Sequence, residues 1–255
     1  MKKRIRIVRA SEIKPDLQVN RPLDQAWVDK LVKNWNENAL GTPVLSSRGT
    51  YFIPLDGQHR IEAIKQMTAD DRRIECLVYE GLMLREEAWL FLKLNEDRPV
   101  LPFYRFERLV TAEDPDALAI THILKTLDLR LQTGSRASSV SAVVALQRIF
   151  RWDPSGDLLR VALTVPMAAW GRDATSFGAD IIGGVALFAR TFPEVAMNGN
   201  ARLTKVLSRS ASGASGLVGK ARTIREVEGG TVAGGVAKVI QHLYNKGLTN
   251  KLVRT

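Results

Sequence analysis

The chain has 255 residues, 45% of them hydrophobic, and a formal net charge of +10 from 37 Lys and Arg against 27 Asp and Glu. This length fits one large or two small domains of a soluble globular protein. A single cysteine, Cys76, excludes an internal disulfide and a cysteine metal cluster, and the sequence has no apolar run of signal-peptide or membrane-span length, so we expect a soluble protein in a reducing cytoplasm.

The first half of the chain predicts alternating strands and helices. Ile5, Ile7 and Val8 alternate with Lys and Arg, which is typical of a half-buried edge strand. Asp24 is placed to cap a helix. That helix carries a stripe at i, i+4 and i+8 that we interpret as core: Trp27, Leu31 and Trp35.

A strand pair follows, around a turn at Arg48-Gly49. The elements of this region are expected as strands at 43–46, 50–55 and 74–79, and as helices at 61–67, 84–94 and 104–111. This mixture of strands and helices predicts a compact α/β domain over residues 1–110.

The second half carries few strand signals. Helices are expected at 140–150, 158–170, 181–192, 203–208 and 232–244. Residues 208–219 are rich in Ser and Gly, and we interpret them as a mobile loop or a linker. The predicted fold class is therefore α+β, with the N-terminal α/β domain followed by a mainly α-helical, basic domain over residues 111–255.

The positive charge lies almost entirely in the second half. Residues 1–130 have a net charge of +1, whereas residues 131–255 carry 16 basic and seven acidic side chains, a net of +9. Charge confined to one half indicates a polyanionic partner, and DNA is the partner we expect; a generically basic surface is the alternative. Our candidates for DNA contact are Arg202, Lys205, Arg209, Lys220, Arg222 and Arg225.

Residues 55–60, with the sequence Leu-Asp-Gly-Gln-His-Arg, join a hydrophobic strand to a helix through a glycine turn. The first N–H groups of a helix have no partner inside it, and the helix dipole favours an anion there. Gly57 permits the tight turn, and Arg60 can grip a phosphate. We therefore expect a phosphate beyond this turn, with Asp56 or Glu62 as the catalytic carboxylate and Asp56 as a ligand of Mg²⁺.

The residues from Asn20 to about Arg108 resemble the ParB N-terminal/sulfiredoxin superfamily. The ParB pattern has an Asn-Pro-Arg-like turn, a proline-led strand pair, a glycine-led phosphate motif that opens a helix, and an Asn-x-x-Arg element. Those places are taken here by Asn20-Arg21-Pro22, Pro43-Val44-Leu45, Gly57-Gln58-His59-Arg60 and Asn95-Glu96-Asp97-Arg98. The Asp-Gly-Gln-His-Arg string and the closing Tyr244-Asn245 segment resemble a narrower branch, called DGQHR or DndB-like. That branch includes accessory proteins of DNA-modification systems and phage proteins described as ParB-like nucleases.

This resemblance implies a DNA-associated, ParB-like accessory factor in DNA modification or DNA transactions, in the cytoplasm of a bacterium or of a phage-infected host. It implies that a nucleotide, ATP or CTP with Mg²⁺, is bound and hydrolysed at the Asp-Gly-Gln-His-Arg loop, so the expected enzyme is an NTPase. The residues it assigns to the phosphates are Arg21, Gly57, Gln58, His59, Arg60, Asn95 and Arg98. The partners it implies are DNA, a DNA-modification enzyme and, in a homo-oligomer, further copies of the chain.

Two departures from the superfamily narrow this interpretation. Gln58 stands where sulfiredoxin has its cysteine, which argues against sulfinic acid reductase activity. Gly-Gln-His-Arg replaces the glycine-acid-Arg-Arg motif of chromosome-segregating ParB, so the choice between ATP and CTP stays open. Three alternatives also stay open: a metal-dependent nuclease using Asp56 and Glu62, a non-enzymatic DNA-binding regulator, and a small-molecule kinase, because free-serine kinases of this superfamily have a similar Asp-Gly-His-His-Arg loop.

Overall fold

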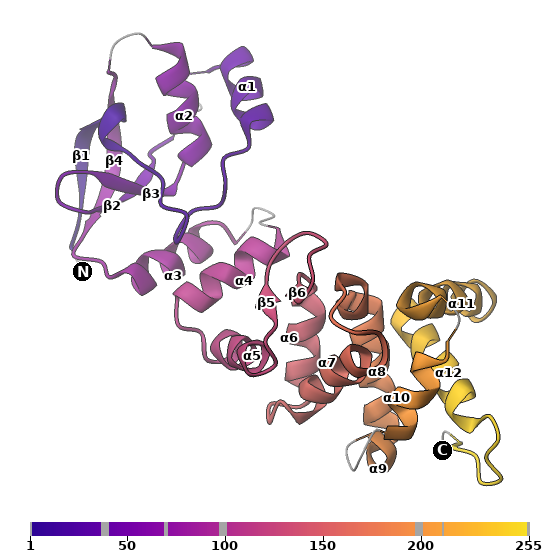
Figure 1. Ribbon diagram of the computed structural model, residues 1–255. Helices are drawn as coiled ribbons and strands as arrows, with labels where there is room; N and C mark the ends of the chain where they lie inside the picture. Colours follow the sequence, from indigo (N-terminus) through magenta and orange to yellow (C-terminus); the bar gives the residue numbers. More distant parts are fainter. Residues whose placement is uncertain are drawn as a thin grey trace. The chain divides into compact units, whose positions relative to one another are not determined.

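The computed structural model describes residues 2–36, 41–68, 71–96, 101–196, 201–210 and 212–253. Its contacts divide the chain into an N-terminal unit, Met1–Asp114, and a helical unit, Pro115–Thr255 (Figure 1). The fold class is α+β, as predicted: a mixed four-stranded sheet with helices is followed by a mostly helical region. Within the described ranges, no helix is long and apolar enough to cross a membrane.

The sheet of the N-terminal unit has the strand order β1-β4-β2-β3. Its strands are β1 (Lys2–Arg9), β2 (Val44–Ser47), β3 (Phe52–Asp56) and β4 (Arg73–Glu80). β1 runs antiparallel to β4, and β2 runs parallel to β4. β2 and β3 form the predicted antiparallel hairpin, and its turn needs the positive φ of 81° that Gly49 adopts.

Helices cover both faces of this sheet (Figure 1). The helices of this unit are η1 (Ala10–Glu12), α1 (Gln25–Lys33), α2 (Gln58–Met67), α3 (Leu84–Leu94) and α4 (Pro102–Thr111), of which α4 packs against α3. α2 packs Ile61 and Ile64 into one core cluster, and α3 packs Phe91 into a second cluster. Because side chains alternate along a strand, neighbours such as Phe52 and Ile53 belong to different clusters, which places α2 and α3 on opposite faces.

β1 is an edge strand, as predicted, but its two isoleucines face away from the core. Ile5 is 63% and Ile7 is 71% exposed, whereas Val8 is buried. The register explains this, because Val8 lies opposite Ile74 in the α2 cluster. Ile5 and Ile7 therefore lie on the other face, where the cluster around α3 reaches Tyr79 and Leu77 of β4 but includes no residue of β1.

The helical unit consists of eight α-helices and a small two-stranded sheet in its described part. The helices are α5 (Pro115–Thr126), α6 (Val143–Trp152), α7 (Asp157–Trp170), α8 (Ala179–Thr191), α9 (Pro193–Ala196), α10 (Ala201–Ser208), α11 (Gly213–Glu228) and α12 (Val232–Asn245). The shorter elements are β5 (Arg130–Leu131), β6 (Ser139–Val140) and the 3₁₀-helix η3 (Ala174–Phe177).

The interpretation of residues 208–219 as a loop or linker was wrong for their second half, because α11 begins at Gly213. Its Ala214, Leu217 and Ala221 are buried at i, i+3 and i+7. A Cβ added at Gly235 of α12 would lie 2.5 Å from the Ala221 carbonyl oxygen, so the two helix backbones approach closely. This packing holds a Gly- and Ser-rich segment in a helix despite its low intrinsic propensity.

Candidate phosphate-binding pocket

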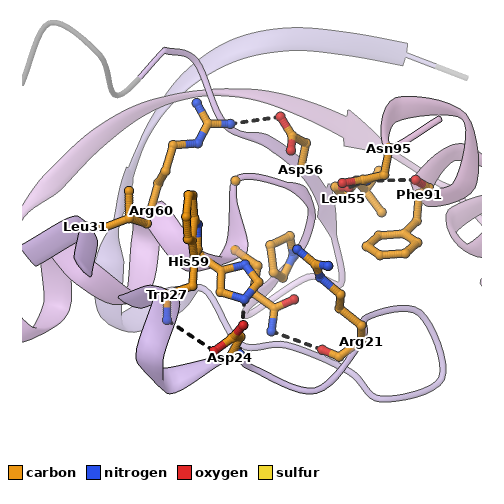
Figure 2. A pocket seen from close by; sticks show the side chains of 13 residues that line it. Arg21, Asp24, Trp27, Leu31, Leu55, Asp56, His59, Arg60, Phe91 and Asn95 are labelled. Carbon is orange, nitrogen blue, oxygen red and sulfur yellow. Dashed lines mark hydrogen bonds and ion pairs between the residues drawn. The ribbon is translucent and has the colours of Figure 1, made fainter. Parts of the chain in front are cut away.

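The N-terminal unit contains a pocket of about 530 Å³ at the start of α2 (Figure 2). Its lining residues are Arg21, Asp24, Trp27, Leu31, Pro54, Leu55, Asp56, Gly57, Gln58, His59, Arg60, Phe91 and Asn95. We call this site the α2 pocket. It unites most of the residues that the sequence assigned to a phosphate, and it adds an apolar wall from α1 and α3.

The strand–glycine–helix junction forms the floor of the α2 pocket. β3 ends at Asp56, and Gly57 adopts a φ of 87° in the left-handed region at the N-cap of α2. A Cβ at this position would make a tight contact of 3.2 Å with Pro43 Cβ, so the limited space favours glycine in addition to the conformation. The first backbone bond of α2 joins Ile61 N–H to the Gly57 carbonyl at 3.0 Å, so the earlier N–H groups point out of the helix end.

Arg60 and Asp56 form an ion pair at the edge of the α2 pocket. Nη2 of Arg60 donates to Oδ2 of Asp56 at 2.8 Å, and both side chains are about one-fifth exposed. The arginine lies close to two glycines, since a Cβ at Gly41 would be 2.9 Å from its Nη1 and a Cβ at Gly57 would be 3.2 Å from its Nη2. The guanidinium is therefore held in a fixed place next to the start of α2.

Arg21 brings a second guanidinium to the α2 pocket (Figure 2). Its turn is fastened to the sheet by the buried Asn20, which donates to the Pro54 carbonyl and accepts from the Asp16 N–H at 2.9 Å. The Arg21 carbonyl accepts a bond of 3.3 Å from Gln58 Nε2. The Arg21 side chain makes no hydrogen bond or ion pair with any residue that the structure describes.

His59 connects α2 to α1. Its Nε2 accepts a hydrogen bond of 3.1 Å from the Asp24 N–H, and the side chain is only 8% exposed. With Nε2 acting as an acceptor, the ring proton of the neutral imidazole is on Nδ1. Asp24 is the predicted cap of α1 and accepts from the Trp27 N–H at 3.1 Å.

Trp27 departs from the interpretation of its stripe as core. Its side chain is 46% exposed and lines the α2 pocket, and the Lys30 ammonium lies 5.1 Å from its ring centre. The buried position of α1 is Val28, one residue further on. The apolar periodicity alone could not show this, because a helix that borders a pocket carries the same spacing as one that borders a core.

The remaining sequence candidates differ in their relation to the α2 pocket. Asn95 lies at its edge, where its Nδ2 donates to the Leu55 carbonyl at 3.1 Å and to the Phe91 carbonyl at 2.8 Å. Arg98 lies outside the described residues. Glu62 does not line the pocket, and its carboxylate lies 3.6 Å from the Lys65 ammonium. In the described ranges, no three His, Cys, Asp or Glu side chains gather as a metal site.

The candidate DNA-contact residues lie on α10 and α11, except Arg209, which follows α10. Arg202 donates to the carbonyls of Tyr244 and Lys246 at 3.0 and 3.2 Å, so its guanidinium fastens the end of α12. Lys205 and Arg209 are exposed. Lys220, Arg222 and Arg225 are exposed on α11, but residues two apart on a helix point in different directions, which separates Lys220 from Arg222.

The basic charge of the helical unit is hardly neutralised by its own acids. Pro115–Thr255 has 18 Lys and Arg against nine Asp and Glu, yet Lys238–Glu228 is the one such ion pair among its described residues. Two of its acids, Asp153 and Asp173, instead accept hydrogen bonds from backbone N–H groups at the starts of α7 and η3. Burial would raise the pKa of Asp153, but hydrogen bonds from Ser155 and the Leu158 N–H lower it.

No curated protein matches this chain. A protein-family model does match it, over residues 14–213, which is more than half of the chain. The matched residues include every residue that lines the α2 pocket and extend through the helical unit to the start of α11. The chain therefore belongs to DUF6551, a family of unknown function.

Proposed function

We propose that the chain binds a nucleotide in the α2 pocket, with the phosphates at the start of α2. The observation that carries this proposal is the Arg21 guanidinium, which has no hydrogen bond or ion pair with the described residues and lies in a pocket with a helix N-terminus. A partly buried cation without a counter-ion costs free energy that a bound anion recovers. Arginine and a helix start together suit a phosphate.

Trp27 favours a nucleotide over inorganic phosphate. Its half-exposed ring, with Leu31 and Phe91, gives the α2 pocket an apolar wall. An exposed indole can stack on a nucleobase and contribute about 1–3 kcal/mol without selecting a particular base. The resemblance to the ParB N-terminal/sulfiredoxin superfamily supports the same assignment, with ATP or CTP as the nucleotide.

A bound phosphate would compete with Asp56 for Arg60. The pair is 2.8 Å apart in the structure, and a phosphate offers the guanidinium a bidentate partner of higher charge. The Asp56 carboxylate would then lose this ion pair. With no protein-only cluster for a metal among the described residues, Mg²⁺ would be held by Asp56 together with phosphate oxygens, as is common for this ion. We propose Asp56, rather than Glu62, as the carboxylate on which hydrolysis depends.

DNA contact by the helical unit is a second proposed activity. It is supported by the nearly unpaired basic residues of that unit, since a protein surface with such an excess attracts phosphate backbones. Together the two activities support an NTP-binding accessory factor in DNA modification or DNA transactions.

The nucleotide proposal is tested by titrating ATP, ADP, CTP and GTP, with and without Mg²⁺, into wild type, Arg21→Ala and Trp27→Phe, with calorimetry and tryptophan fluorescence as readouts. Arg105→Ala is the matched control, because Arg105 is exposed on α4 in the same unit and does not line the α2 pocket. A lost charge-assisted hydrogen bond should raise the Kd of Arg21→Ala about 10- to 100-fold.

Trp27→Phe should lose most of the fluorescence change while it still binds, and Arg105→Ala should behave as wild type. Phosphate release from wild type but not from Asp56→Asn would support hydrolysis at this site. If no nucleotide binds wild type, or if Arg21→Ala and Arg105→Ala have the same affinity, the proposal fails.

A further inference from the structure

Two arginines of the helical unit flank the same tryptophan. The guanidinium carbons of Arg148 on α6 and Arg190 on α8 lie 5.4 Å and 5.2 Å from the Trp152 ring centre. We call these three residues the Trp152 cluster. Cation–π attraction fixes both cations on the ring. The cations are thereby held no more than about 11 Å apart, so they concentrate positive potential at this place on the helical unit.

The Trp152 cluster has no counter-charge in the described part of the helical unit. Neither Arg148 nor Arg190 makes an ion pair or a hydrogen bond with a described residue. Asp153 follows Trp152 directly, but its carboxylate accepts from Ser155 and from the Leu158 N–H at the start of α7. No acid of the described residues therefore neutralises the charge of the two guanidinium groups.

Other arginines of this unit are used differently. Arg172 donates to the carbonyls of Leu127 and Asp128, as Arg202 does to those at the end of α12. These hydrogen bonds stabilise the fold, and the N–H groups that make them are not available to a ligand. Arg190, by contrast, is exposed, and none of its five N–H donors bonds to a described residue.

The position of Arg148 is built into the packing of α6 against α8. A Cβ at Gly183 of α8 would lie 2.9 Å from Arg148 Nη2, so the guanidinium passes over a helix position that has no side chain. Its Nε is buried and has no hydrogen-bond partner among the described residues, which leaves a desolvated part of the cation uncompensated. This arrangement is pre-organised, and an anion on the cluster would offset the burial and neutralise the unpaired charge.

We propose that the Trp152 cluster is a site where the helical unit binds the phosphate backbone of DNA, with Arg148 and Arg190 contacting neighbouring phosphates. Arg151, exposed next to Trp152, adds to the local potential. This inference rests on the proposed DNA contact and gives it a location other than the six sequence candidates on and near α10 and α11. Contacts of this kind give affinity and register without reading base sequence.

The test is a salt titration of a fluorescein-labelled 30-base-pair duplex, by anisotropy, with wild type and Arg148→Ala/Arg190→Ala. The double variant should bind about tenfold more weakly, and its slope of log K against log salt should be flatter by about 2. The matched control is Arg130→Ala/Arg136→Ala, which removes the same charge from exposed positions of the same unit. Lys205→Ala/Arg209→Ala tests the α10 face in parallel.

Arg190→Glu provides a second variant, since this side chain is exposed and its replacement leaves the packing of α6 and α8 in place. It should weaken duplex binding more than Arg190→Ala while its melting temperature stays that of wild type. If wild type itself does not bind the duplex at 50 mM salt, the proposed DNA contact fails together with this inference. If wild type binds, but the cluster variants keep its affinity and slope, the inference alone is overturned.

Discussion

Nε2 of His59 accepts a hydrogen bond from the backbone N–H of Asp24, and Asp24 is the residue that caps α1. This bond fastens the start of α2 to the start of α1. Replacing His59 with Phe removes the acceptor and leaves a backbone donor without its partner. We expect the free energy of unfolding to fall by about 1–3 kcal/mol in urea denaturation followed by tryptophan fluorescence. Gln58→Ala, which removes a longer bond of 3.3 Å to the Arg21 carbonyl, should cost less. If His59→Phe and Gln58→Ala lose the same free energy of unfolding, the bond between His59 and Asp24 has no special importance for the contact between α1 and α2.

Glu87 should be among the most costly side chains to remove from the N-terminal unit. Its carboxylate is fully buried and accepts from Ser46 Oγ at 2.6 Å and from Arg48 Nε at 2.8 Å. The hydrogen bond with Glu87 raises the pKa of the Arg48 guanidinium above its ordinary value, although burial opposes this. Glu87→Ala leaves the partly buried Arg48 without its main partner, so we expect a loss of about 3–5 kcal/mol in urea denaturation.

The control for Glu87 is Glu113→Ala, which breaks a pair with Arg85 that is more than half exposed on both sides. An exposed pair of this kind contributes about 0–1 kcal/mol. A large loss in both variants would indicate that the effect comes from charge rather than from burial.

The Cys76 thiol should be unreactive in the native protein. Burial, with a smaller effect of the Glu75 charge, raises the pKa of Cys76 to about 12. We expect no reaction with a disulfide reagent at pH 8 in buffer and one equivalent in denaturant, whereas Thr223→Cys, exposed on α11, should react in buffer. Rapid native labelling of Cys76 would contradict its burial.

The same shift predicts a loss of stability in alkali. The unfolded thiol loses its proton near pH 8.5, while the native thiol keeps it up to about pH 12. The unfolded state therefore binds fewer protons in this window. This group should make the free energy of unfolding fall by at most about 1.4 kcal/mol per pH unit between these values, and Cys76→Ala should lack this component in urea titrations across the range.

Gly235 should not tolerate a methyl group. An added Cβ would meet the Ala221 carbonyl oxygen of α11 at 2.5 Å, and a backbone atom cannot move aside as a side-chain end can. Overpacking of this kind costs about 1–3 kcal/mol, which exceeds the helix propensity that alanine gains. Gly219→Ala is the matched control, because its Cβ would meet nothing within 4 Å and should stabilise α11. In thermal melts followed by circular dichroism at 222 nm, the melting temperature should fall for Gly235→Ala and rise for Gly219→Ala.

Elements with local signals were predictable from the sequence. Asp24 caps α1 as expected, the expected helix at 84–94 coincides with α3, and the glycine turn leads from β3 into α2. The expected helix at 140–150 begins late, at Val143, because Ser139 and Val140 pair with β5 instead. Local patterns carry these features because caps and turns depend on residues only a few positions apart.

The features that the sequence missed depend on distant residues. No local pattern shows that Glu87 would meet Arg48, since a Glu in the first helical turn is most often exposed. The loop of the α2 pocket was predicted, but its apolar wall was not, because Trp27 and Phe91 come from helices on either side of it in the sequence. A half-exposed tryptophan can be distinguished from a core one only by its surroundings.

The strand order also has a consequence for synthesis on the ribosome. β1 pairs with β4, so residues 10–72 must be made before the first strand finds its partner. At roughly 5–20 residues per second, β1 waits for several seconds. A strand that waits is open to pairing with other chains, and Lys and Arg are the side chains that discourage such pairing. Five of the eight residues of β1 are Lys or Arg, and two of the others are the exposed Ile5 and Ile7. The basic side chains therefore protect the nascent strand from pairing with other chains.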